Sequence, residues 1–381
     1  MRVALFTNNY LPFRGGVTTA VETLRRGLHD LGHAAWVFAP AATPPLGDPA
    51  WVFRYPSVSA PTYPGFRLPV PASRRLAATA RALAPDLVHV HHPFLLGVTG
   101  RRLARRLGVP LVFTYHTRYE KYAHYVPLPG RLVRALAIRL SCRFADTADL
   151  VVAPSTWIAD LLRARGVRAR TVVVPTGVPL DAFTPGDRAA ARREMGLPPG
   201  PLCLYAGRLD PEKSVERVLD AFALVSDAVP DARLLLVGQG SHTAALQRHA
   251  ARTHAAARIT FAGGRPRDVL PAYYRAADLF LFASETETQG LVLAEAQACG
   301  LPAVAVRAPG VEEVVEDGVT GVLVKADARS LAEASVRLLL DPERRAALGA
   351  AARGRVAQDF CARRQVEAMV GHYAALGAAG A

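Results

Sequence analysis

Short apolar segments alternate with helical patterns along the whole of this 381-residue chain, and that alternation limits its possible folds more than any other feature. The segments are rich in Val, Leu and Phe and lack alternating polar residues, as parallel strands buried on both faces do. In the first half they predict strands at Val3–Thr7, Ala35–Ala39, Leu87–His91, Leu111–Tyr115, Leu150–Pro154 and Thr171–Val174. A helix over residues 17–31 would place Val17, Val21, Leu24, Leu28 and Leu31 on one face.

A second series of the same kind follows a Pro- and Gly-rich connection at Val174–Asp187. It predicts strands at Leu202–Ala206, Arg233–Val237, Ile259–Ala262, Leu279–Ala283, Ala303–Val306 and Val322–Val324. Two such series predict an α/β fold of two Rossmann-like, doubly wound domains, residues 1–178 and 179–357, that face each other across a cleft. Sheets of this kind bind ligands at the carboxyl ends of their strands.

The composition excludes several other classes of protein. With 51% hydrophobic and 20% charged residues, the chain suits a folded globular protein. No apolar run approaches the roughly 18 residues of a membrane span, and the opening MRVALFTNNYLP is typical of a first strand rather than a signal peptide. The cysteines have neither disulfide nor metal spacing, so we expect a reducing cytoplasm.

The excess positive charge is confined to one half of the chain. The formal net charge is +14; residues 1–180 hold 23 Lys and Arg against 8 Asp and Glu, whereas residues 181–381 hold 23 against 24. A one-sided basic surface predicts an anionic partner, such as membrane lipid, nucleic acid or an acidic substrate. Arginine usage in an Ala- and Arg-rich genome is the alternative, but it does not explain the asymmetry. No basic motif interleaved with aromatic residues supports nucleic acid.

The stretch ETETQGLVLAEAQACGLP, residues 285–302, carries the strongest functional signal. Glu287 lies in a Thr-Gln-Gly turn that opens an apolar helix, and Glu295 lies within that helix, which should end at Gly300. A helix N-terminus can hold a phosphate, and eight helical residues rise about 12 Å. One carboxylate could therefore hold a sugar hydroxyl and the other a ribose, with a diphosphate between them. A surface helix with two solvated acids is the less favoured alternative.

A second segment, GRLDPEKS at Gly207–Ser214, follows a predicted strand and precedes a helix. Arg208 can bind phosphate oxygens in a bidentate manner, and Lys213 can act as a point charge. A surface turn with ordinary salt bridges is equally compatible with this segment alone. Together with the glutamate segment, it favours a diphosphate site.

Three further glycine turns follow predicted strands, at Gly15-Gly16, at VGQGS (237–241) and at FAGGRPR (261–267). The first lets the backbone approach a ligand but does not meet the GxGxxG dinucleotide fingerprint. Gly238 and Gly264 could form the floor for a nucleotide base. Each of these turns could equally be a plain entry into a helix.

A histidine-rich neighbourhood surrounds Tyr115-His116-Thr117, where His116 could contact a sugar hydroxyl. The other histidines are His89, His91, His92 and His124. No metal site is predicted, because HExxH, Cys/His spacing and Asp-x-Asp are all absent. There is also no G-x-S-x-G elbow and no phosphate-binding GxxxxGK[ST] loop, which counts against a hydrolase or an NTPase.

Two basic helices in the first half suggest a membrane surface. GRRLARRLG places Arg101, Arg102, Arg105 and Arg106 in a stripe, and a second helix carries Arg131 and Arg134 among leucines. Such helices can lie on anionic membranes with Arg in the headgroups and Leu in the lipid. Packing of each helix on its own sheet is the alternative, and the excess charge favours the membrane.

From FTNNYLPFRGGV (6–17) to EDGVTGVLV (316–324), the chain resembles the retaining GT-B glycosyltransferases of family four. The glutamate pair with the following ACGLP is the family's most specific signature. TETQGL and YHTRYEKYAHY (115–125) resemble the bacterial diacylglycerol glycosyltransferases, peripheral membrane enzymes that transfer glucose or galactose from a UDP-sugar to diacylglycerol.

The resemblance implies a role for each candidate residue. Glu287 would bind donor hexose hydroxyls and Glu295 the ribose, while Arg208 and Lys213 hold the diphosphate. Gly15, Gly16, Gly207, Gly238, Gly264 and Gln289 would line the donor site, and Gly290, Leu291 and Val292 would offer backbone N–H groups. His116 would contact the transferred sugar. Gln289 replaces a Phe of the wider family, which fits the lipid enzymes. A last helix, residues 358–381, would cross back to the first domain.

We therefore expect a retaining, metal-independent hexosyltransferase without a cofactor, using a UDP-hexose and a lipid acceptor at the inner face of the cell membrane. The acceptor hydroxyl would attack from the side on which the diphosphate leaves, with the protein stabilising the leaving charge. GDP-mannose as donor, or a soluble sugar or glycan as acceptor, is the alternative. A non-catalytic nucleotide-sugar binding protein is disfavoured by the intact set of charged residues.

Overall fold

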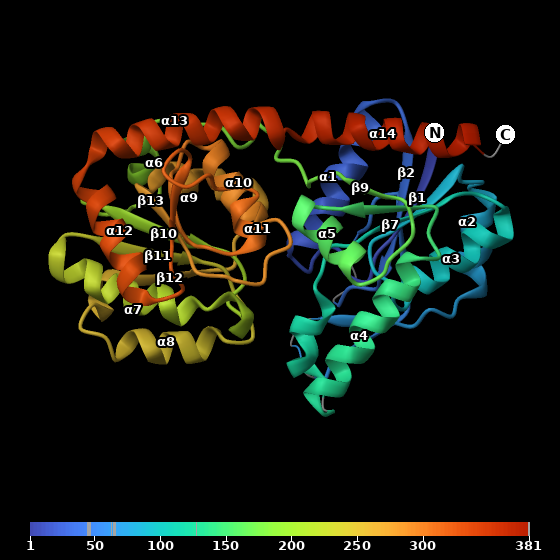
Figure 1. Cartoon of the computed structure of the whole chain (residues 1–381), viewed down its shortest axis with the longest axis horizontal. Helices are drawn as coiled ribbons and strands as arrows, with labels where there is room; N and C mark the ends of the chain where they lie inside the picture. Colours follow the sequence, from blue (N-terminus) through green and yellow to red (C-terminus); the bar gives the residue numbers. More distant parts are fainter. Residues whose placement is uncertain (44–46, 62, 64–65, 127, 380–381) are drawn as a thin grey trace. The chain divides into compact units, whose positions relative to one another are not determined.

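The computed structural model describes residues 1–43, 47–61, 63, 66–126 and 128–379. The chain divides into two compact units (Figure 1). Unit 1 comprises Met1–Gly177 with Ala362–Ala381, and unit 2 comprises Val178–Cys361. The sequence placed the first boundary after residue 178 and the return at residue 358. Of the predicted last helix, residues 380–381 lie outside the described residues.

Unit 1 is built on a parallel seven-stranded sheet in the order β3-β2-β1-β6-β7-β8-β9. Its strands are β1 (Arg2–Phe6), β2 (Ala34–Pro40), β3 (Val52–Tyr55), β6 (Leu87–Val90), β7 (Leu111–Thr114), β8 (Leu150–Ala153) and β9 (Thr171–Val173). A separate antiparallel pair consists of β4 (Ser57–Ser59) and β5 (Arg67–Pro69). The order reverses between β1 and β6, which is where an open sheet of this kind forms a ligand-binding crevice.

Helices cover both faces of this sheet. They are α1 (Gly16–Asp30), α2 (Arg74–Ala82), α3 (Leu96–Leu107), η1 (Tyr119–Tyr125), α4 (Gly130–Ala145), α5 (Thr156–Ala164) and α14 (Ala362–Ala379). Strand β1 shows how the faces divide, because Val3 and Leu5 pack with α1 and α14, whereas Ala4 and Phe6 pack with α2 to α5. The alternation of side chains along a strand therefore produces two cores.

Unit 2 contains a parallel six-stranded sheet in the order β12-β11-β10-β13-β14-β15. Its strands are β10 (Leu202–Ala206), β11 (Arg233–Val237), β12 (Ile259–Gly263), β13 (Leu279–Phe282), β14 (Ala303–Val306) and β15 (Gly321–Val324). Its helices are α6 (Arg188–Glu194), η2 (Pro211–Lys213), α7 (Val215–Ala228), α8 (Thr243–Ala251), η3 (Ala256–Arg258), η4 (Arg267–Val269), α9 (Leu270–Ala276), α10 (Leu291–Ala298), α11 (Pro309–Glu312), α12 (Ala328–Leu340) and α13 (Pro342–Asp359).

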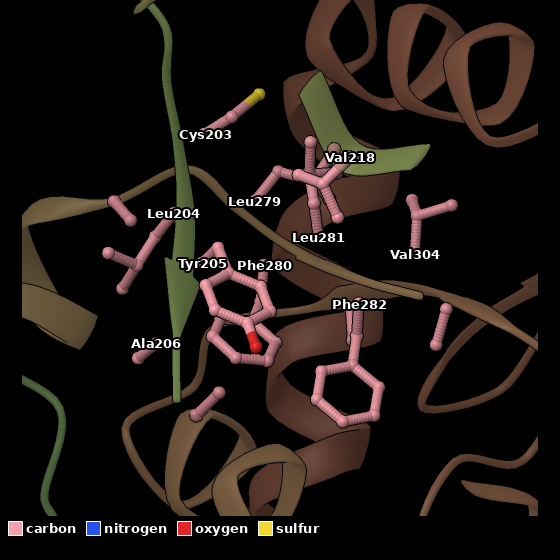
Figure 2. Close-up of a cluster of buried hydrophobic side chains, with 14 of the residues drawn as sticks. Cys203, Leu204, Tyr205, Ala206, Val218, Leu279, Phe280, Leu281, Phe282 and Val304 are labelled. Carbon is pink, nitrogen blue, oxygen red and sulfur yellow. The ribbon is translucent and has the colours of Figure 1, made fainter. Parts of the chain in front are cut away.

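The core of unit 2 lies around its central strands β10 and β13. Figure 2 shows Tyr205 of β10 close to Phe280 and Phe282 of β13, and all three side chains are fully buried. Tyr205 and Phe282 stack with ring centroids 6.5 Å apart. This aromatic layer supports the ends of the two strands from which the candidate site projects.

The predicted α/β fold with two Rossmann-like halves is confirmed. Each predicted strand overlaps the observed one to within one residue at either end. The sequence missed β3, β4 and β5, which are short segments at or beyond the edge of the first sheet.

Candidate functional site

In unit 2 the candidate residues lie in loops at the switch point of the sheet. Strand β10 has β11 on one side and β13 on the other, so the loops after β10 and β13 leave the same edge of the sheet in neighbouring positions. The first loop carries Gly207, Arg208 and Lys213, and the second carries Glu287, Gln289 and Gly290. Open α/β sheets bind ligands at this position.

The loop after β10 is held in one conformation by contacts that only glycine permits. Gly207 has a φ of +154°. A Cβ on Gly238, in the loop after β11, would lie 1.8 Å from the carbonyl oxygen of Gly207. Asp210 joins the same two loops, because its Oδ1 accepts from the backbone N–H of Ser241 at 2.7 Å and from its hydroxyl at 2.8 Å. Gly207 and Gly238 therefore serve the close packing of two backbones.

The two cations predicted to hold a diphosphate are both paired with carboxylates. Arg208 donates to Asp210, and to Glu212 at 2.8 Å. Lys213 Nζ donates to Glu287 Oε1 at 2.6 Å. The structure therefore brings Lys213 and Glu287 together across 74 positions of sequence, a contact that the sequence reasoning did not predict.

The Lys213–Glu287 pair is largely buried, with about one seventh of each side chain exposed (14% and 15%). Burial alone would raise the pKa of the Glu287 carboxyl. The charge and hydrogen bond of Lys213, a hydrogen bond from Ser284 and the charge of Arg208 outweigh it and hold the pKa below its usual value. Glu287 is consequently ionised at neutral pH and can accept hydrogen bonds from ligand hydroxyls.

Helix α10 begins at Leu291, and its N-cap residue Gly290 adopts a left-handed conformation with φ +76°. Among the described residues, no side-chain hydrogen bond caps this end of the helix, and the first N–H groups of a helix have no acceptor within it. The backbone of half-buried Leu291 and Val292 lies in this first turn, and Gln289 before it is buried. The helix therefore presents a positive end beside Glu287, as an anion site requires.

Glu295 lies one turn further along α10 and is buried. Its Oε1 accepts from Arg267 Nη2 at 2.9 Å, and its Oε2 accepts from the Tyr274 hydroxyl at 3.2 Å. Arg267 also stacks over the ring of Phe183, 5.2 Å from the ring centre to the guanidinium carbon. Arg267 was missed as a site residue, although it ends the FAGGRPR turn that the sequence singled out.

Gly264 belongs to the same turn as Arg267. A Cβ there would lie 2.8 Å from Oε1 of Gln239. The turns after β11 and β12 thus approach each other beside Arg267.

In unit 1, the turn between β1 and α1 is open around its glycines. Within the part of the chain that the structure describes, a Cβ on Gly16 would meet nothing within 4 Å, and one on Gly15 would meet only the Phe13 ring at 3.6 Å. Neither glycine has a φ in the left-handed region. Close packing of the fold therefore does not require glycine at Gly16, which leaves room for a ligand.

His116 follows β7 and lies beside His91, which follows β6. Nδ1 of His91 and Nε2 of His116 are 2.9 Å apart. His89 bonds Tyr373 of α14 and Thr114, both at 2.6 Å. Together with Thr114, these three histidines line a small cavity of about 50 Å³. Nε2 of His91 is buried there without a hydrogen-bond partner in the described part of the chain.

Burial lowers the pKa of these imidazoles. The pKa of His116 falls to about 3 through burial alone. The pKa values of His89 and His92 also fall to about 3, mainly through burial and then through the charge on His116. The pKa of His91 falls well below its usual value. All four rings are neutral at physiological pH, so each can donate and accept one hydrogen bond.

The six arginines predicted to face a membrane differ in their surroundings. Arg101 is half buried and lies over the Phe144 ring at 5.5 Å. The side chains of the other five are exposed: Arg102, Arg105, Arg106, Arg131 and Arg134. The last two lie on α4, beside leucines that are unusually exposed for their type: Leu132 is 61%, Leu136 49% and Leu140 41% exposed. These three leucines are four residues apart and form one stripe along the helix.

Two negative findings complete the description. Among the residues that the structure describes, no helix is long and apolar enough to cross a membrane. Within the same residues, no group of three or more His, Cys, Asp or Glu side chains could hold a metal ion.

Two family profiles together span most of the chain. One, described as Glycosyltransferase Family 4, matches residues 14–182, and the other, described as Glycosyl transferases group 1, matches residues 187–355.

Curated relatives and a solved structure agree with these profiles. The chain is 31% identical to alpha-monoglucosyldiacylglycerol synthase of Streptococcus pneumoniae, covering 85% of this chain and 75% of that protein. It is 36% identical to a GDP-mannose-dependent alpha-mannosyltransferase of Mycobacterium tuberculosis, covering 85% and 84%. The fold matches sucrose-phosphate synthase of Thermosynechococcus elongatus with a TM-score of 0.82 at 26% identity, over 100% of both chains.

Proposed function

We infer the reaction from the premise that this chain belongs to the family-four glycosyltransferases of GT-B fold and is therefore a hexosyltransferase. We propose that it transfers glucose or galactose from a UDP-sugar to a membrane lipid, diacylglycerol, with retention of configuration and without a metal ion. The acceptor hydroxyl attacks from the side on which UDP leaves, and a phosphate oxygen of UDP takes its proton.

The geometry of unit 2 supports the donor site that we propose. Arg208 and Lys213, together with the positive end of α10, would stabilise the negative charge that develops on the departing diphosphate. The ionised Glu287 would accept hydrogen bonds from the hexose hydroxyls, and Glu295 from the ribose. Lys213 and Glu287 already bond each other at 2.6 Å, so they are held side by side before the donor arrives.

The acceptor side rests on unit 1. His116 would contact the transferred sugar with a neutral imidazole, and the turn at Gly15-Gly16 would leave space near the phosphates. We place the enzyme at the cytoplasmic face of the membrane, where α4 would meet its lipid acceptor.

The exposed leucine stripe of α4 is the observation that carries the lipid acceptor. Burying three exposed leucines in lipid is favourable by about 1.5–3 kcal/mol for each side chain that is fully buried. Arg131 and Arg134 flank the stripe and can bind anionic headgroups. The relative from Streptococcus pneumoniae is itself named for a diacylglycerol product, which supports the same acceptor.

A donor and acceptor screen tests the proposal. Labelled UDP-glucose, UDP-galactose and GDP-mannose are each incubated with vesicles that contain diacylglycerol and, separately, with soluble sugars, and the products are resolved by chromatography. We expect a monoglycosyl lipid from one of the two UDP-sugars, with α configuration at the new bond. A product formed only with soluble acceptors would overturn the lipid proposal.

The second candidate is mannose transfer from GDP-mannose. The mannosyltransferase relative at 36% identity favours it. The GDP-mannose arm of the same screen decides between the two, since a lipid product from that donor alone would replace the UDP-hexose proposal.

A further inference from the structure

A second pocket in unit 1 is lined by arginines and lies between α2 and α3. Its volume is about 220 Å³. The polar residues around it are Arg74 and Arg81 of α2, Arg102 and Arg106 of α3, and the hydroxyl residues Ser73 and Thr99. Apart from Tyr55, the other described lining residues are apolar, and none is a carboxylate. It shares no described lining residue with the candidate donor site or the histidine cavity, and its Arg102 and Arg106 belong to the arginines that the sequence predicted to face a membrane.

Some arginines of α2 and α3 line the pocket and others do not. Arg74 and Arg81 are seven positions apart and Arg102 and Arg106 are four apart, so each pair lies on one face of its helix. Their sequence neighbours Arg75 and Arg105 do not line the pocket, and Arg101 lies over the Phe144 ring. Each helix therefore directs two of its arginines to one cavity.

Four positive charges around one cavity repel one another unless an anion joins them. In the part of the chain that the structure describes, none of the four makes an ion pair with a carboxylate, unlike Arg208 or Arg267 in unit 2. Like charges four residues apart also disfavour a helix. A bound anion would remove both penalties.

The chemistry of the lining matches a phosphate group. Guanidinium groups bind phosphate oxygens through paired N–H bonds. The hydroxyl of Ser73 accepts from the Leu76 N–H and caps α2, so its own proton can be donated to the ligand beside the positive end of the helix. The cavity of about 220 Å³ has room for a phosphate with a few carbon atoms.

We propose that this pocket binds the phosphate group of a small ester, at a site separate from the donor site. The phosphate is carried either by a membrane phospholipid headgroup or by a soluble ester such as glycerol phosphate. Arg74, Arg81, Arg102 and Arg106 neutralise the phosphate, and the apolar lining accepts its carbon atoms. Phosphate binding in this pocket is independent of the reaction proposed above.

Binding of defined phosphates by the full chain tests the proposal. Calorimetry with inorganic phosphate and glycerol 3-phosphate measures binding of soluble phosphates. Flotation compares vesicles containing phosphatidic acid with charge-matched vesicles whose anionic lipid is a fatty acid, which carries no phosphate. We expect binding in at least one arm that weakens about tenfold or more in Arg81→Gln/Arg102→Gln, which removes one guanidinium from each helix.

The matched control is Arg75→Gln/Arg105→Gln, which removes the same charge from the same two helices outside the pocket. We expect this variant to bind inorganic phosphate and glycerol 3-phosphate in solution within about twofold of the natural chain. Equal losses in both variants would show that net charge rather than the pocket attracts phosphate, and would overturn the proposal. Absence of binding in both arms for the natural chain would do the same.

Circular dichroism establishes that each variant is folded. Should Arg81→Gln/Arg102→Gln fail to fold, Arg74→Gln/Arg106→Gln tests the same pocket with the other two side chains. Binding of glycerol 3-phosphate in solution assigns a soluble ligand, whereas binding confined to phosphatidic acid vesicles assigns the lipid headgroup.

Discussion

At the scale of single residues, the Lys213–Glu287 pair joins the two loops of the donor site before any ligand is present. An isolated buried carboxylate costs several kcal/mol, and a positioned lysine offsets this cost. Since Lys213 is proposed to bind the diphosphate and Glu287 the hexose, stability and function would both depend on this one contact.

Removing Lys213 should therefore destabilise the protein as well as inactivate it. We expect Lys213→Met to lose about 1–3 kcal/mol of unfolding free energy, below the cost for a fully buried pair because some solvent reaches both side chains. Turnover should fall about 100-fold, as it does when a donor to a developing charge is lost. Urea unfolding and initial rates measure the two effects.

The double variant Lys213→Met/Glu287→Gln is the control, since it removes the unpaired charge and should recover part of the stability.

The stabilisation that the Lys213–Glu287 pair contributes has a defined pH dependence. The folded pKa of Glu287 is lowered, so the contribution is present above its ordinary value near 4.5 and is lost as the pH falls through the lower folded value. A difference between the natural chain and Lys213→Met that persists unchanged down to pH 3 would contradict this assignment.

The site glycines divide into two kinds, which substitution by alanine separates. Gly16→Ala adds a methyl group that meets no atom of the described residues within 4 Å, so the melting temperature should change by no more than about 2 °C. Activity should nevertheless fall at least about tenfold if the donor approaches there. Gly238→Ala, in contrast, places its methyl 1.8 Å from a carbonyl oxygen and should lose several kcal/mol. Calorimetric melting and rates decide, and full activity of Gly16→Ala would remove that turn from the site.

The sequence could identify residue types but not their partners. Arg208 and Glu287 stand in loops that follow predicted strands, Lys213 ends the short helix η2 after Arg208, and Glu295 lies in α10 after Glu287. Their positions just after predicted strands are what allowed the sequence to identify them. Arg267 was not selected, because its partner Glu295 lies 28 positions away and only the packing of α9 and α10 brings the two together. The pairing of Lys213 with Glu287 could not be predicted either, because the two residues are 74 positions apart in the sequence.

At the scale of elements, α4 is the helix whose surface departs most from the expectation for a globular protein. An amphipathic helix normally buries its leucines, yet Leu132, Leu136 and Leu140 are exposed while Cys142 and Phe144 near its end are buried. The sequence pattern alone allowed packing on the sheet or contact with a membrane. The exposure of the stripe favours the second.

Polar substitutions along this stripe should release the enzyme from lipid. We expect Leu132→Ser/Leu136→Ser/Leu140→Ser to float with anionic vesicles at least about tenfold less than the natural chain, while activity on a detergent-solubilised acceptor is retained. Leu340→Ser is the control, because Leu340 is 66% exposed in unit 2 and its loss should not change flotation. Unchanged binding of the triple variant would exclude α4 as the membrane contact.

The buried parallel strands could be predicted because each one is visible in the sequence as a separate short run of apolar residues. Strand β3 escaped prediction because Arg54 interrupts it and because an edge strand needs fewer apolar residues. Arg54 forms a salt bridge with Asp48 at 2.6 Å. The local sequence pattern gives no sign of this pairing.

At the scale of the whole molecule, the two units differ in how they should respond to acid. Unit 1 buries His89, His91, His92 and His116 as neutral rings, with pKa values lowered to about 3 for His89, His92 and His116. An unfolded histidine titrates near 6.5. Between these values the unfolded state binds more protons, so the stability of unit 1 falls as the pH falls from about 6.5 toward 3. Unit 1 should therefore unfold at a higher pH than unit 2.

The distribution of tryptophan makes this prediction measurable in the intact chain. All three tryptophans, Trp36, Trp51 and Trp157, lie in unit 1, so tryptophan fluorescence follows that unit alone whereas far-ultraviolet circular dichroism follows both. On acidification we expect the fluorescence transition to precede the loss of helix signal. In His92→Asn, the new side chain can still accept the hydrogen bond that the Asn8 N–H donates to His92 Nδ1 at 3.1 Å. This variant should shift the midpoint of the fluorescence transition to lower pH. The exposed His29→Asn should leave it unchanged. Removing one buried titrating group must reduce the number of protons taken up on unfolding. Coincident transitions, or equal shifts in both variants, would therefore show that burial of these imidazoles does not govern the acid response.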